Sequence, residues 1–189
     1  MNYDALVIAT GASPFIPPIP GVEKAGVTGL RTLAQAKDIL AGMKAGTKCA
    51  CIGGGLLGIE LAVGLAKRGG HVTILEGFSW LLPRQLAPRA SAILKSRIES
   101  LGLKVMCGVK VASIMGNERV TGVSLESGET LEAGMVLISA GVRPNMGLAT
   151  GCGLETRKGV KVDDDMATSD PAIFAAGDVT EHAGIIYGL

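Results

Sequence analysis

Apolar residues form two patterns that alternate along the chain. Short continuous apolar runs occupy residues 3–10, 48–52, 71–75 and 135–139. Longer segments, in which apolar residues recur at helical spacing, occupy residues 32–43, 56–68 and 88–101. Buried strands that alternate with amphipathic helices are typical of a parallel sheet. The pattern therefore predicts an α/β fold with a Rossmann-like core.

The spacing also predicts which face of each helix packs inward. We expect loops at residues 21–30 and 81–85, because proline, glycine and charged residues interrupt the pattern there. The residues predicted to face inward are Leu33, Ala36, Leu40 and Met43, then Leu57, Leu61 and Leu65, then Ala90, Ile93, Leu94, Ile98 and Leu101.

The pattern changes to short strands after residue 102. Strands are predicted at residues 103–106, 109–114 and 120–125, followed by a brief return strand that ends at Leu131. We interpret this stretch as an antiparallel β-meander that replaces a crossover helix. The run 135–139 then rejoins the parallel sheet beside the run 48–52, where a bound cofactor would lie.

Three glycines follow the run 48–52 in the spacing G-x-G-x-x-G. Gly53 permits a tight turn, Gly55 lacks the Cβ that would keep a pyrophosphate from the backbone, and Gly58 lets the helix lie close to its strand. The first helical N–H groups can hold phosphates. The predicted dinucleotide-binding residues of this turn are Gly53, Gly54, Gly55, Leu56, Leu57 and Gly58.

Glu76 ends the next apolar run, about 20 residues after the glycine turn, where a carboxylate accepts hydrogen bonds from an adenosine ribose. A carboxylate also repels a 2′-phosphate, and Gly77, Phe78 and Ser79 provide no cation. We therefore predict NAD(H) as the cofactor. A methyltransferase also combines a glycine turn with an acidic residue, so the remainder of the chain has to distinguish the two.

Composition and charge exclude several classes of protein. Hydrophobic residues make up 48% of the chain, and 18 basic residues balance 17 acidic ones. This balance predicts no nucleic-acid partner, and the interrupted apolar runs predict no membrane partner. The four cysteines lack metal-ligand or C-x-x-C spacing, so we expect reduced thiols in a cytoplasmic protein and no metal site. Cys49 and Cys51 share one side of a strand, as a reactive pair or, as we predict, as small buried hydrophobic residues.

One sequence pattern occurs twice. Residues 8–14 align without a gap with residues 138–144, so that each copy has a strand, a glycine, two further residues and a proline. Two related nucleotide-binding domains would explain this repeat better than chance similarity of two buried strands.

Five segments together resemble the FAD-dependent pyridine nucleotide-disulfide oxidoreductases, in the branch of NADH oxidases, ferredoxin or rubredoxin reductases and nitrite reductase flavoproteins. These segments are residues 9–11, 53–60, 81–84, 141–145 and 173–179. The resemblance implies that Glu60 lies near the nicotinamide, although it could be an ordinary solvated carboxylate. It also implies that Gly141 belongs to the NAD site and that Thr10, Gly11 and Asp178 belong to a flavin site.

The resemblance implies a domain order. Residues 29–145 would form the NAD(H)-binding domain, with partial FAD-domain strands in residues 1–28 and 146–189. The first flavin glycine motif of the family is missing, so we expect an excised middle part without a complete FAD site and without a catalytic residue of its own.

The implied function is transfer of hydride from NADH to FAD and then to an external acceptor that the sequence does not identify. The alternative is a stand-alone NAD-binding or sensing module. A short-chain dehydrogenase is not supported, because neither Tyr3 nor Tyr187 begins a Tyr-x-x-x-Lys motif. We expect NADH as ligand and, through the flavin-domain strands, a possible homodimer.

Overall fold

The computed structural model describes residues 3–186. Packing groups the chain into two compact units, a central unit of residues 16–141 and a split unit made of residues 1–15 and 142–189. The central unit begins before residue 29 because Ile19, Val22 and Val27 pack against one of its cores. These units are defined by packing alone, so residues 29–145 as the limits of the NAD(H)-binding domain stay a prediction.

A five-stranded parallel sheet forms the middle of the central unit. Its strand order is β3-β10-β4-β5-β6, and every neighbouring pair is parallel. The bounds are β3 Val27–Gly29, β10 Met135–Ile138, β4 Lys48–Ile52, β5 His71–Glu76 and β6 Lys104–Cys107. The predicted return of the run 135–139 beside β4 is confirmed. The predicted loop at 21–30 is wrong in part, because its last residues pair with β10 as the edge strand β3.

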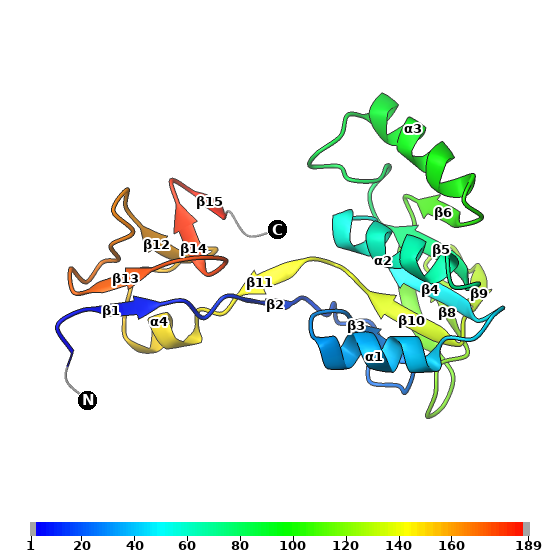
Figure 1. Ribbon diagram of the computed structural model, residues 1–189, viewed down its shortest axis with the longest axis horizontal. Coiled ribbons are helices and arrows are strands. Elements are labelled where there is room, and N and C mark those ends of the chain that lie inside the picture. Colours follow the sequence, from blue (N-terminus) through cyan, green and yellow to red (C-terminus); the bar gives the residue numbers. More distant parts are fainter. Residues whose placement is uncertain (1–2, 187–189) are drawn as a thin grey trace. The chain divides into compact units, whose positions relative to one another are not determined.

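Three helices pack on one face of this sheet. They are α1 Leu33–Gly42, α2 Leu56–Ala66 and α3 Pro88–Glu99. Thr32 begins α1 with a capping box, in which its side chain accepts from the Gln35 N–H while the Gln35 side chain accepts from the Thr32 N–H. Alternate strand residues such as Cys49 and Cys51 face these helices, as the pleat of a strand requires. Figure 1 shows α2 crossing in front of β4 and β5.

The predicted inner faces of the helices are partly wrong. Leu33, Leu57 and Ile93 are 72%, 51% and 69% exposed, and Leu40 and Leu101 are also exposed. The sheet instead receives faces that include small residues, because small side chains let a helix backbone come close. The fully or nearly buried helix residues are Ile39 in α1, Gly58, Ile59, Ala62 and Leu65 in α2, and Ser91 and Ile98 in α3.

An antiparallel meander covers the other face of the sheet, as predicted for residues 109–131. The predicted inclusion of residues 103–106 in this meander is wrong, because that run forms β6 and pairs in parallel with β5. The strands of the meander are β7 Val111–Met115, β8 Gly122–Leu125 and β9 Thr130–Glu132. Apolar side chains from the meander and the opposite side of β4 and β10 form a second core, which includes Ile52, Val123, Val136 and Ile138. The sheet is therefore buried on both faces, as parallel sheets require.

The split unit consists of small sheets built from both ends of the chain. β1 Leu6–Ile8 pairs in parallel with β13 Ile173–Ala175. β12 Val160–Val162, β14 Thr180–His182 and β15 Ile185–Ile186 form a three-stranded sheet that the sequence pattern did not predict. Together with α4 Gly147–Gly151, these elements surround a core that contains Ile8, Val160, Ile173 and Val179.

The two copies of the repeated pattern pair with each other. β2 Ala12–Pro14 and β11 Val142–Pro144 form an antiparallel ribbon in the register Ala12↔Pro144 and Pro14↔Val142. The glycine before each strand, Gly11 or Gly141, has a positive φ of 65° or 98°. The copies thus share a backbone turn as well as a sequence, which supports the interpretation as a repeat.

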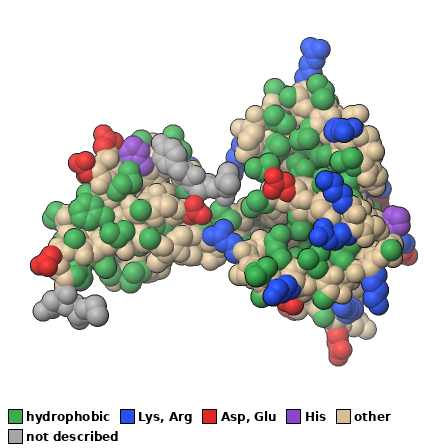
Figure 2. Space-filling model, in the orientation of Figure 1, with side chains coloured by type: hydrophobic (Ala, Val, Ile, Leu, Met, Phe, Trp, Pro, Cys, Tyr) green, Lys and Arg blue, Asp and Glu red, His purple; other side chains and the backbone are tan. Residues whose placement is uncertain are grey.

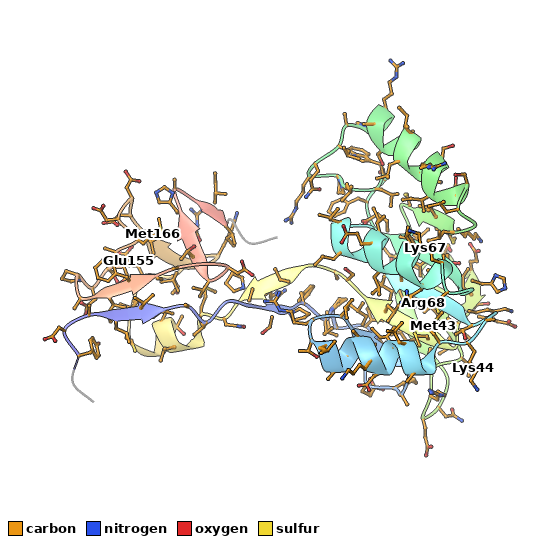
Figure 3. All side chains as sticks on the ribbon, in the orientation of Figure 1. Met43, Lys44, Lys67, Arg68, Glu155 and Met166 are labelled. Atoms are coloured by element: carbon orange, nitrogen blue, oxygen red, sulfur yellow. The ribbon has the colours of Figure 1, made fainter. Side chains whose placement is uncertain are left out.

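Cations gather where α1 and α2 end, at the amino edge of the parallel sheet. Lys44 follows α1, while Lys67 and Arg68 follow α2 (Figure 3). Gly69, with φ of +84°, turns the chain away from α2. Positive charges complement the carboxyl-terminal dipole of a helix.

The surface in Figure 2 shows Lys and Arg side chains on the larger unit with hydrophobic side chains between them. In residues 3–186, no helix combines the length and the apolar character needed to cross a bilayer.

Candidate nucleotide-binding site

The carboxyl edge of the parallel sheet contains a point where the strand order reverses. From β4 the chain continues to β5 and β6 on one side, whereas β10 lies on the other side of β4. In open α/β sheets, ligands bind in the crevice at such a point. Three predicted segments meet this edge: the glycine turn after β4, Glu76 at the end of β5, and Gly141 after β10.

Two glycines of the turn are needed because backbone approaches backbone. Gly53 has φ of +113°, and a Cβ there would lie 2.2 Å from the Ser139 carbonyl oxygen. A Cβ on Gly58 would lie 2.2 Å from the Gly53 carbonyl oxygen. Real side chains do not tolerate these distances, so the geometry agrees with the predicted tight turn and close helix packing. Gly55 has no atom within 4 Å of its would-be Cβ, which leaves its backbone open to a ligand.

Glu76 is held against the glycine turn. Its side chain is only 7% exposed, and its Oε2 accepts from the Gly54 N–H at 2.6 Å. Its Oε1 accepts from the Phe78 N–H at 2.8 Å. A carboxylate has about four lone-pair positions, so each oxygen can accept a further hydrogen bond. The two backbone donors therefore fix the carboxylate at the edge of the sheet while acceptor capacity remains.

Gly54 has a role that the motif spacing alone did not indicate. A Cβ on Gly54 would lie 2.9 Å from Glu76 Oε2 and 2.5 Å from Leu81 Cδ2. Glycine at this position is what allows the carboxylate to reach the turn backbone.

The loop after β5 also contacts the turn. Leu81 is fully buried, and the Leu82 N–H donates to the Gly54 carbonyl oxygen at 3.2 Å. Leu82 has φ of +52°, a conformation that costs a branched residue about 1–2 kcal/mol. Packing of Leu81 and the bond to Gly54 hold this conformation in place, so the loop is part of the site.

Helix α2 begins at the turn and presents its first residues to solvent. Leu56 is 47% exposed, and Leu57 and Glu60 are exposed as well. The first N–H groups of a helix have no acceptor within the helix, and the N-terminal dipole favours negative charge. The amino end of α2 therefore suits a phosphate group. Among residues 3–186, the Glu60 side chain makes none of the hydrogen bonds or ion pairs found in the structure.

The predicted flavin-side residues lie at the corresponding edge of the split unit. β1 and β13 are parallel, with Ile8 opposite Ala175, so Thr10 and Gly11 leave one strand beside Gly177 and Asp178 leaving the other. Gly11 and Gly177 have φ of +65° and +79°, and neither would-be Cβ has an atom within 4 Å. Open backbone at the carboxyl edge of paired parallel strands fits a ligand there.

The site residues thus form two groups. The central unit places Gly53 to Gly58, Glu76 and Gly141 at one sheet edge, while Glu60 is exposed within α2. The split unit places Thr10, Gly11 and Asp178 after the paired strands β1 and β13. Sequence reasoning missed Asn145, whose side chain and backbone bind Thr10, Gly11 and Ser13. His182, for which no partner was visible in the sequence, lies 2.7 Å from Asp164.

Two of the four cysteines lie in the interior of the parallel sheet. Cys49 and Cys51 are buried in β4, and burial raises the pKa of Cys49 to about 11 and that of Cys51 to about 12. They are the buried hydrophobic residues predicted above. Within the described part of the chain, no cluster of three His, Cys, Asp or Glu side chains could hold a metal ion.

The sequence and the fold were both compared with those of known proteins. The sequence profile of the pyridine nucleotide-disulphide oxidoreductases matches residues 1–187. A nitrite reductase [NAD(P)H] of Bacillus subtilis is 40% identical over 187 residues, which are 99% of this chain and 23% of that protein. A ferredoxin reductase of Rhodopseudomonas palustris superposes with a TM-score of 0.93 at 32% identity, over 100% of this chain and 47% of its own.

A water-forming NADH oxidase of Lactobacillus brevis, bound to NADH, is 26% identical with a TM-score of 0.87 over 95% of this chain and 40% of its own. An engineered, NADPH-bound form of it gives 25% identity and a TM-score of 0.88 over the same shares. The chain spans from about a quarter to about half the length of the curated relatives it matches.

Proposed function

Because the chain belongs to the pyridine nucleotide-disulphide oxidoreductase family, we propose that its central unit binds NADH in preference to NADPH for transfer of hydride to FAD. The observation that carries the proposal is the buried Glu76 carboxylate beside the glycine turn. In the whole protein, electrons then pass to an external acceptor. FAD supplies the redox chemistry when bound, and the residues described here bind and orient.

Each part of the turn has a defined task in this proposal. The backbone at Gly55 and the first N–H groups of α2 bind the pyrophosphate, for which the open space at Gly55 leaves room. Glu76 accepts hydrogen bonds from the adenosine ribose with the lone pairs that Gly54 and Phe78 do not use. A 2′-phosphate would bring negative charge to an already negative and largely buried group, which disfavours NADPH.

The engineered oxidase supports this assignment. The form bound to NADPH differs from its NADH-binding parent by replacement of a glycine, an aspartate, an alanine, a methionine and a proline. When the glycine of that enzyme is placed on Gly58, the same intervals along this chain fall on Glu76, Gly77, Phe78 and Pro83. The aspartate of that enzyme thus corresponds by spacing to Glu76, and its replacement accompanies the change of nucleotide.

On the flavin side, Thr10, Gly11 and Asp178 would contribute to the FAD site. Their open backbone at a shared strand edge fits such a ligand. These few residues are too small a set to retain FAD, so we expect the isolated chain to be colourless and without NADH oxidase activity. Stoichiometric flavin absorbance in the purified chain would contradict this expectation.

Calorimetric titration of the chain with NADH and NADPH tests the nucleotide preference. We expect at least tenfold tighter binding of NADH, since one charge-assisted hydrogen bond contributes about 1.5–3 kcal/mol. Glu76→Gln should weaken NADH binding and remove most of the preference, and Glu76→Arg should favour NADPH. Glu129→Gln, an exposed carboxylate in the β8–β9 turn, is the matched control. Equal or tighter binding of NADPH by the unaltered chain would overturn the proposal.

We also propose that two copies of the chain can associate through the β1–β13 pair. In the described residues this sheet has two strands, and Val7 on β1 is 60% exposed. Strand edges of this kind can pair with another chain. Sedimentation should show a dimer of the whole chain and a monomer of residues 16–141, and a monomer in both samples would refute the association.

A further inference from the structure

Asn145 connects two segments that are far apart in the sequence. Its backbone N–H donates to the Gly11 carbonyl oxygen at 2.8 Å, and its side-chain Nδ2 donates to the Thr10 carbonyl oxygen at 2.8 Å. In return, the Thr10 hydroxyl donates to the Asn145 carbonyl oxygen at 2.8 Å. One residue thus makes three hydrogen bonds with a two-residue turn.

A fourth hydrogen bond fixes the side-chain amide. The Ser13 hydroxyl donates to Asn145 Oδ1 at 2.8 Å. An amide that accepts on Oδ1 and donates from Nδ2 has both ends engaged, so its orientation is determined. Asn145 directly follows β11 and Ser13 lies in β2, the two strands of the ribbon labelled in Figure 1. The hydrogen bond from Ser13 therefore connects the amide to this ribbon.

The turn that Asn145 holds would otherwise have few constraints. Gly11 has φ of +65° and no atom within 4 Å of its would-be Cβ, and Thr10 is exposed. Glycine loses more conformational freedom than any other residue when a turn is ordered. External hydrogen bonds are therefore needed to select one conformation of Thr10 and Gly11.

We propose that Asn145 is a positioning residue that sets the backbone geometry of the Thr10–Gly11 turn toward FAD, an inference that rests on the flavin role proposed above. Asn145 acts through the turn. Among residues 3–186, it makes no hydrogen bond to the predicted NAD(H)-binding residues of the central unit. Its loss should therefore change flavin binding while NADH binding is retained.

The test uses the longer flavoprotein that the proposed function assumes for this chain. Asn145→Asp keeps the shape and the Ser13 bond but places a carboxylate oxygen against the Thr10 carbonyl oxygen. We expect about tenfold weaker FAD binding by flavin fluorescence, from the loss of a hydrogen bond and the unpaired carbonyl. The flavin midpoint potential should shift, and the Kd for NADH should stay within twofold.

Two further variants separate positioning from general stability. Thr10→Val removes a different bond of the same contact, so a double-mutant cycle with Asn145→Asp should be non-additive in FAD affinity. Thr150→Val removes a hydroxyl that donates to backbone within α4 and should leave FAD affinity and potential unchanged.

Additive effects, an unchanged FAD affinity and potential in Asn145→Asp, or an equal loss in Thr150→Val would each overturn the inference. If Asn145→Asp does not fold, Thr10→Val with rescue by Thr10→Ser decides by the same criterion. Absence of FAD from the longer flavoprotein without substitutions would instead refute the proposed function. Failure of the inference about Asn145 and failure of the proposed function are therefore distinguishable.

Discussion

β10 and β1 lead into the two copies of the repeated pattern but lie in very different surroundings. All four residues of β10 are buried, and β10 pairs with β3 on one side and β4 on the other. β1 has three residues, pairs with β13 alone among the described strands, and leaves Val7 60% exposed. Similar local sequence thus gives a core strand in one unit and an edge strand in the other, because neighbouring strands and covering helices decide burial. We therefore expect the central unit to be the more stable one.

Cysteine labelling should show the largest difference between the units. Cys152 in the split unit is exposed, whereas Cys49 and Cys51 lie buried in β4. A pKa of about 12 leaves the Cys51 thiolate about a thousandfold less populated at pH 7 than that of an ordinary thiol. Iodoacetamide followed by mass spectrometry should modify Cys152 at least a hundredfold faster. Equal rates for Cys152 and Cys51 would show that the parallel sheet opens readily.

Substitution of one strand-exit glycine in each unit should give the next largest effect. Gly53→Ala places a Cβ 2.2 Å from a backbone oxygen at a positive φ, which should cost about 2–5 kcal/mol of unfolding free energy. Gly11→Ala has the same sign of φ but open space, so only about 1–2 kcal/mol is expected. Urea unfolding, followed by far-UV circular dichroism and by cysteine labelling in each unit, measures both losses. If Gly11→Ala lowers the unfolding free energy as much as Gly53→Ala does, the crowding at Gly53 does not set it apart from Gly11.

Acid should destabilise the split unit through Glu181. Burial tends to raise the pKa of this carboxyl, but N–H donors of Lys158 and Gly159 and the charges of Arg157 and Lys158 hold its pKa below the ordinary value. A lowered folded-state pKa contributes stability above the unfolded-state pKa, near 4.3, that is lost as pH falls through the folded-state value. Thermal unfolding at pH 7 and below pH 4 should show this loss, and Glu181→Gln should reduce it. Glu129→Gln in the central unit should leave the acid response unchanged.

The smallest effects concern two residues with positive φ. Met166 in the split unit (Figure 3) has φ of +61° and is 38% exposed, so Met166→Gly should raise stability by about 0.5–1 kcal/mol. Leu82 in the central unit has φ of +52° but packs against the core, so Leu82→Gly should gain less or lose stability. Unfolding free energies of the two variants test this order. A larger gain in Leu82→Gly would show that strain outweighs packing there.

The sequence predicted those parts of the molecule in which neighbouring residues contain the signal. The glycine turn, β5 and the position of Glu76 follow from one contiguous stretch, and the meander follows from short strands joined by turns. β3 was missed because Val27–Gly29 becomes a strand only through pairing with β10. The faces of α2 and α3 were misassigned in part because large apolar residues were counted, while Gly58, Ala62 and Ser91 are among the residues that face the sheet. In α1 the buried residue is Ile39, which the predicted face did not include.

The candidate site was predictable to a similar extent. The spacing of Gly53, Gly55 and Gly58 predicted a tight glycine turn, and the exit of β5 predicted that Glu76 lies beside it. No local pattern predicts the hydrogen bond between Gly54 and Glu76 or those between Asn145 and the Thr10–Gly11 turn. These bonds depend on which distant chain segments lie together in the fold. Asn145 was visible only as the last residue of a family motif, without a reason for being asparagine.

The register of the β2–β11 ribbon has a consequence for the modular architecture of the chain. Pro14 lies opposite Val142, so the chain enters and leaves the central unit at adjacent points about 5 Å apart. A segment with adjacent ends can be inserted into, removed from or exchanged within a host with little disturbance of that host. Antiparallel strands in such a register can be joined by a two-residue hairpin turn such as Asn-Gly. The central unit could therefore be cut out at this ribbon and replaced by the central unit of a relative.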